Sequence, residues 1–183
     1  MTTVSLITTL ASLALFGGFV GLSVHRFGWR RSYSAYAAKW HEAVPLASNT
    51  HLWSIVTVVV ALLLVPALLE RGEGDPWQFL GFFAPMYLCF AAFTPEYEDQ
   101  PGDNDYMRRV RKRQRIIHYV GTALCAIVSV AWICFVAERW WTIPVWLLAA
   151  WLAAYATITV KKSWLFWLEM AMFGAAYTTI FIG

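Results

Sequence analysis

The sequence predicts an all-α integral membrane protein: a polytopic bundle of six transmembrane helices, with a short interfacial amphipathic helix between the first and the second. Two observations predict this fold. The chain of 183 residues is 60% hydrophobic and only 14% charged, which leaves too few polar side chains to cover a soluble globule. Six apolar stretches are also each about long enough to cross some 30 Å of hydrocarbon as a helix. They define one transmembrane domain, 1–183, with spans at about 4–24, 52–69, 77–94, 116–137, 142–160 and 164–182.

The distribution of basic residues predicts the orientation of the chain. Twelve of the fourteen lysines and arginines fall in the first, third and fifth loops, and only Arg71 and Arg139 fall in the second and fourth. Because basic residues in short loops are retained in the cytoplasm, we expect both termini outside it, in a multi-pass protein of a bacterial inner (plasma) membrane. This grouping also accounts for the net charge of +3. The expected partners are therefore the lipid bilayer and its anionic headgroups at the cytoplasmic face, and not nucleic acid.

The first span is expected to remain in the membrane as a helix. It has no basic segment before it and no convincing cleavage site, so it differs from a signal peptide. Small residues recur on it about four apart, at Ala14, Gly17, Gly18 and Gly21. This spacing lets another helix approach closely. We expect that partner helix within the same chain, and a homo-oligomer seam is the alternative.

The first inner loop is expected to contain the interfacial helix, at about 31–44. Its aromatic and aliphatic residues share one helical face: Tyr33, Tyr36, Ala37, Trp40 and Val44. Such a helix typically lies in the headgroup layer with its rings toward lipid. Trp40 is therefore predicted to bind the membrane surface. A role in gating or in binding a partner is the alternative.

The third and fourth spans each have one informative feature. Pro85 lies at the centre of the third, where its missing amide predicts a kink or an opened helix that can shape a pocket. Before the fourth span, the chain changes from five acidic residues in 94–105 to six basic ones in 106–115. The basic half is expected to continue the fourth helix inward by about two turns, against anionic headgroups. Its predicted membrane-surface residues are Arg108, Arg109, Arg111, Lys112, Arg113 and Arg115.

Histidines and one glutamate supply the candidate ligand or proton site. All four histidines fall toward the cytoplasmic face, and Glu169 is the only ionisable residue well inside a span, where such residues often have a function. Glu169 with His118 or His51, beside the Pro85 kink, is the predicted site. The alternative is ordinary interfacial polarity with structural hydrogen bonds. No metal-ligand spacing such as H-x-x-x-H is present, so we predict no metal, cofactor or catalytic residue.

Several features resemble small uncharacterised bacterial polytopic membrane proteins. They are the string Ser32-Tyr-Ser-Ala-Tyr after the first span, a glycine in the third, His118 at the opening of the fourth and Glu169 in the last. This resemblance implies six helices and no known activity. The string from Glu42 to His51 also resembles the segment before the first helix of the progestin and adipoQ receptor class of membrane hydrolases. The chain departs from that class because its aspartates all lie in loops and no histidine follows His118.

Three classes of function remain. The leading one is a bundle that binds or transports a small molecule or an ion, with a polar layer facing the cytoplasm, because interrupted helices and buried acids are common in such sites. The second is a structural or regulatory subunit that docks a partner through its cytoplasmic loops. The third is a metal-dependent intramembrane enzyme, and we consider an enzyme less favoured than a binding protein.

Overall fold

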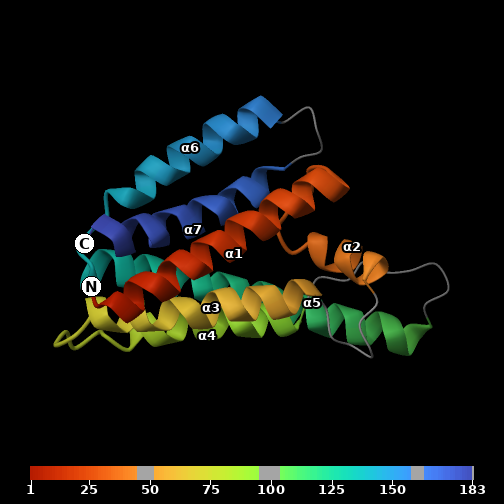
Figure 1. The fold of residues 1–183 in the computed structure, drawn as a ribbon. Helices are drawn as coiled ribbons and strands as arrows, with labels where there is room; N and C mark the ends of the chain where they lie inside the picture. Colours follow the sequence, from red (N-terminus) through yellow and green to blue (C-terminus); the bar gives the residue numbers. More distant parts are fainter. Residues whose placement is uncertain (45–51, 95–103, 158–162, 183) are drawn as a thin grey trace.

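A computed structural model describes residues 1–44, 52–94, 104–157 and 163–182, and all regular structure in these ranges is helical (Figure 1). The all-α prediction is confirmed. The elements are α1 (Thr3–Phe27), α2 (Tyr36–Ala43), α3 (Leu52–Arg71), α4 (Leu80–Phe93), α5 (Asp105–Ala131), the π-helical turn η1 (Trp132–Val136), α6 (Thr142–Thr157) and α7 (Trp164–Ile182).

Four helices are long and apolar enough to cross a membrane, not the six that the sequence predicts. They are α1, α3, α5 continued by η1, and α7. The predicted spans 77–94 and 142–160 are helical and apolar, but α4 has 14 residues and α6 has 16. At 1.5 Å per residue they cover about 21 and 24 Å, short of the hydrocarbon thickness of about 30 Å. One cause lies before α4, where the Asp75 carboxylate accepts the Trp77 amide at 2.6 Å and holds a turn in place of the first helical residues.

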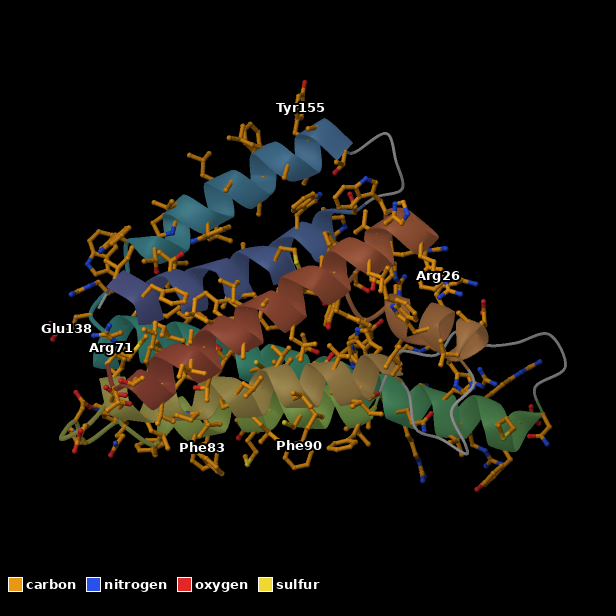
Figure 2. The ribbon with its side chains drawn as sticks, in the orientation of Figure 1. Arg26, Arg71, Phe83, Phe90, Glu138 and Tyr155 are labelled. Atoms are coloured by element: carbon orange, nitrogen blue, oxygen red, sulfur yellow. The ribbon has the colours of Figure 1, made fainter. Side chains whose placement is uncertain are left out.

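The helices form one bundle (Figure 1). α3, α4 and α5 pack in series, α1 packs against α3, and α6 forms a hairpin with α7. Both termini lie at one end of the bundle, and the first turns of α5 project beyond the other end (Figure 1). Arg26 lies near that second end, whereas Arg71 and Glu138 lie at the end with the termini (Figure 2).

The glycine face of α1 does not make the close helix pair that we predicted within the chain. A Cβ added at Gly17, Gly18 or Gly21 would meet no atom within 4 Å. The opposite, hydroxyl-bearing face is buried instead, and Ser12 donates to the Val60 carbonyl of α3 at 2.9 Å. Hydroxyl groups need partners when they are buried, so this face determines the packing of α1. The homo-oligomer seam stays a prediction.

The interfacial helix is shorter than predicted and turns inward. It covers Tyr36–Ala43 rather than 31–44, and its aromatic face is buried in the protein. Trp40 stacks on Phe19 with ring centroids 5.3 Å apart and donates from Nε1 to Ser23 Oγ at 2.8 Å. The predicted contact of Trp40 with lipid is therefore wrong, because α1 covers this face.

Candidate functional site

A cavity of about 320 Å³ lies between α3, α4, α5, η1 and α7. It contains three of the four residues that the sequence singled out: Glu169, His118 and Pro85. The fourth, His51, lies outside the described residues. α4 continues as a helix through Pro85, so this proline lines the cavity without the opened helix that its missing amide allows. Three separate helices thus contribute the predicted residues to one site.

His118 has a defined orientation in the cavity wall. Its side chain is buried, and Nδ1 lies 2.9 Å from the carbonyl oxygen of Ala91 at the end of α4. A carbonyl oxygen only accepts, so Nδ1 carries the proton and, in the neutral ring, Nε2 is the acceptor nitrogen. Gly121 permits this contact, because a Cβ there would lie only 3.3 Å from the Ala91 amide nitrogen. A close approach of α4 to α5 therefore fixes the histidine.

Glu169 connects α7 to the segment between α1 and α2. Its Oε2 atom accepts a hydrogen bond from the Tyr33 amide at 2.6 Å, and the Phe166 amide donates to the Arg31 carbonyl at 2.8 Å. These two bonds hold the segment against the beginning of α7. An amide that donates to a carboxylate makes a stronger bond than a neutral pair, and here it supplies a partner to an acid that would be costly in the bilayer.

Tyr33 adds a polar wall that the sequence did not reveal. Its ring lines the cavity, and its hydroxyl lies 3.1 Å from Thr57 Oγ1 of α3. Thr57 Oγ1 itself donates to the Trp53 carbonyl at 2.8 Å, so the tyrosine hydroxyl is the donor of the first bond. Burial raises the pKa of the Tyr33 hydroxyl far above its ordinary value. The group therefore remains a neutral donor.

Two buried indoles in the cavity wall have N–H groups with no hydrogen-bond partner in the described part of the chain. They belong to Trp53, near His118, and to Trp132, at the start of η1. Both side chains are at most 2% exposed. An indole N–H can only donate, and leaving such a donor unsatisfied costs about 1–3 kcal/mol. Both residues thus bring an unsatisfied donor into the wall of the cavity.

The cavity is elongated along the bundle. Lining positions on α5 and η1 run from His118 to Trp132, about 21 Å at the helical rise. Polar groups gather at the His118 end, whereas leucine, alanine, methionine and phenylalanine line most of the length. Two lining side chains, Tyr119 and Leu168, remain 46% and 38% exposed. The cavity therefore reaches the outer surface of the bundle between α5 and α7.

The basic segment is helical, as predicted. Asn104 caps α5 by accepting the Met107 amide at 2.9 Å, and the helix includes the whole of 105–115, so the extension is nearer three turns than two. Arg108, Lys112 and Arg115, with Ile116 and Tyr119, border an open groove. Tyr119 therefore lines both this groove and the cavity.

The described residues form no metal site and no disulfide. Within the described ranges, no group of three histidine, cysteine, aspartate or glutamate side chains is placed to hold a metal ion. Cys89, Cys125 and Cys134 are free thiols. His25 and His41 do not line the cavity, so the layer of histidines expected from topology contributes one described member, His118, to this site.

Comparison of the chain with protein-family models, with curated proteins and with solved structures gives no match.

Proposed function

We propose that this protein is a six-span membrane protein that binds a small, largely apolar molecule with a polar end. The observation that carries the proposal is the elongated apolar cavity whose wall includes Glu169 and His118 toward one end. The wall also includes the Trp53 and Trp132 indoles, whose N–H groups have no partner among the described residues. Small-molecule sites typically combine mostly apolar walls with a few placed polar groups. The polar end of the cavity faces the cytoplasm, and both termini lie on the other side.

The placement of charge supports six spans. Most basic residues belong to the end of the bundle with Arg26, α2 and the first turns of α5, and that end is the expected cytoplasmic one (Figure 2). α4 and α6 lie alongside the longer helices (Figure 1). A short span is accommodated by local thinning of the bilayer at modest cost. Six crossings also place the single bases Arg71 and Arg139 together on the outer side.

The residues that line the cavity define how such a molecule is bound. Its apolar body packs along α5 and α7, where contact with side chains replaces contact with lipid. An acceptor atom at its polar end receives a hydrogen bond from the Trp53 indole, which removes the cost of a donor that has no partner among the described residues.

A photoreactive fatty alcohol tests this function. We expect such a long-chain probe, with a diazirine at the end of its chain, to label the purified protein in phosphatidylcholine vesicles. Ala126→Phe fills the cavity from α5 and should remove most of this labelling, whereas Ala149→Phe adds the same ring to an exposed position of α6 and should not.

Equal labelling of the wild type and both variants contradicts the proposal. If Ala126→Phe is not monodisperse after purification, Ala176→Phe fills the same cavity from α7 and replaces it in the comparison.

A further inference from the structure

One face of α5 continues from the basic groove into the cavity. Its residues follow one another in alternating steps of four and three, the spacing of a single helical stripe: Arg108, Lys112, Arg115, Tyr119, Thr122 and Ala126. The first four border the groove, the last three line the cavity, and Tyr119 belongs to both. The groove and the cavity therefore lie end to end along one face of the helix.

The chemistry of this path changes along its length. The basic residues lie on the first turns of α5, at the end where this helix projects beyond α3 and α4 (Figure 1). From Arg115 to Ala126 the path covers about 17 Å along the axis, which is close to the 15 Å or so of one leaflet of hydrocarbon. A cationic groove at the membrane surface, followed by an apolar slot of leaflet depth, matches a molecule with an anionic head and an acyl chain.

We propose that the ligand of the cavity is an anionic phospholipid. Arg108, Lys112 and Arg115 bind its phosphate, and one acyl chain passes Tyr119 into the slot between α5 and α7. This inference rests on the proposed function and names the ligand class for that site. The Glu169 carboxylate does not oppose it, since Oε2 is directed to the Tyr33 amide inside the cavity while the headgroup lies on the exposed basic turns.

The other cations of the segment supply a matched control. Arg109 and Arg113 are exposed and one turn apart on the same helix, like Arg108 and Lys112, but they lie off the stripe. General attraction of a basic helix to an anionic surface depends on charge and not on helical face. The two pairs therefore distinguish a bound headgroup from surface attraction.

The experiment uses the full chain in phosphatidylcholine vesicles with a trace of phosphatidic acid carrying a diazirine at the end of one acyl chain. We expect this probe to label the cavity side chains of Met172 and Phe173 in preference to phosphatidylcholine with the same chain. The double variant R108Q/K112Q should lower that labelling on the order of tenfold. R109Q/R113Q should leave it nearly unchanged. An equal loss in both double variants overturns the inference.

Competition distinguishes a lipid from a free anion. Excess unlabelled phosphatidic acid should displace the probe, and inorganic phosphate at the same concentration should not. Displacement by phosphate alone would assign the groove to a free phosphate group and overturn the lipid assignment. Labelling by the neutral fatty alcohol without any preference for phosphatidic acid would leave the proposed function standing and refute this inference, whereas no cavity labelling by either probe would refute both.

Discussion

Glu169 and His118 are each held by a backbone group of another element. Glu169 accepts the Tyr33 amide, and His118 donates to the Ala91 carbonyl. The Glu169 bond joins the cavity to the segment between α1 and α2, and the His118 bond joins it to the end of α4. The polar end of the site therefore depends on the packing of the whole bundle.

The Glu169–Tyr33 bond predicts a difference between two substitutions. Glu169→Ala removes the acceptor, leaves the Tyr33 amide without it and should lower the free energy of unfolding by about 1–3 kcal/mol. Glu169→Gln retains an acceptor oxygen in the same place and should cost less than half as much. Denaturant unfolding in detergent measures both values. Equal stability of the two variants would mean that the bond contributes nothing.

The Trp132 indole, which has no partner among the described residues, predicts a difference between two tryptophan substitutions. Trp132→Phe removes an N–H group that has no partner among the described residues, so the ligand-free protein should be as stable as the wild type or more stable. Trp40→Phe removes the donor to Ser23 Oγ and should cost about 1 kcal/mol. Thermal unfolding in detergent compares them. A loss for Trp132→Phe as large as that for Trp40→Phe would show that its N–H is satisfied.

At the scale of elements, a small residue matters where a neighbouring element approaches closely. A Cβ at Gly81 of α4 would lie 2.8 Å from the Leu68 carbonyl oxygen of α3, whereas one at Gly17 of α1 meets nothing. Gly81→Ala should therefore cost about 1–3 kcal/mol through overpacking.

Gly17→Ala should have the opposite effect on the free energy of unfolding. It raises the helix propensity of α1 without a clash and should stabilise the protein by about 0.5–1 kcal/mol. Unfolding of both glycine variants under one set of conditions tests the pair. Destabilisation by Gly17→Ala would show that the glycine face of α1 has a partner, as a homo-oligomer seam would provide.

The same contrast shows what could be predicted from the sequence. Hydropathy gave the position and order of the helices, and the depth of Glu169 and His118 within them followed from that order. A pattern of small or aromatic residues shows which face is apolar or smooth, but not whether lipid or protein covers it. For this reason the glycine face of α1 and the aromatic face of α2 were both assigned to the wrong surroundings.

Tyr33, Trp53 and Trp132 had no signal that could mark them as site residues. The bond between the Tyr33 amide and Glu169 joins positions 136 residues apart, and no local periodicity encodes it. Tryptophan is common in membrane proteins, above all at the interfaces, so neither indole stands out in the sequence. That their N–H groups have no partner among the described residues is visible only after the helices are packed.

For the whole molecule, the orientation in the membrane follows from charge and can be measured directly. In a variant without the three native cysteines, a cysteine at Glu73 or Glu138 should react with a membrane-impermeant maleimide in intact cells. A cysteine at Lys39 or Arg109 should react only after permeabilisation. Reaction of Glu73→Cys and Arg109→Cys from the same side would show that α4 does not cross.

A cysteine at the C-terminus tests in the same way whether α6 crosses the membrane. If both α6 and α7 cross, a cysteine added after Gly183 lies on the side of Glu138 and reacts in intact cells. If α6 does not cross, the two positions react from opposite sides. α6 has 16 residues and α4 has 14, so both crossings of the six-span proposal need a test of this kind.

The most direct test of ligand binding inside the bundle is to map where the photoreactive fatty alcohol attaches. Mass spectrometry of the labelled protein in phosphatidylcholine vesicles should place the label on cavity-lining residues such as Thr122, Met172 and Phe173. Label confined to exposed side chains of α6, such as Leu148 and Leu152, would show that the probe contacts only the lipid-facing surface and would contradict binding in the cavity.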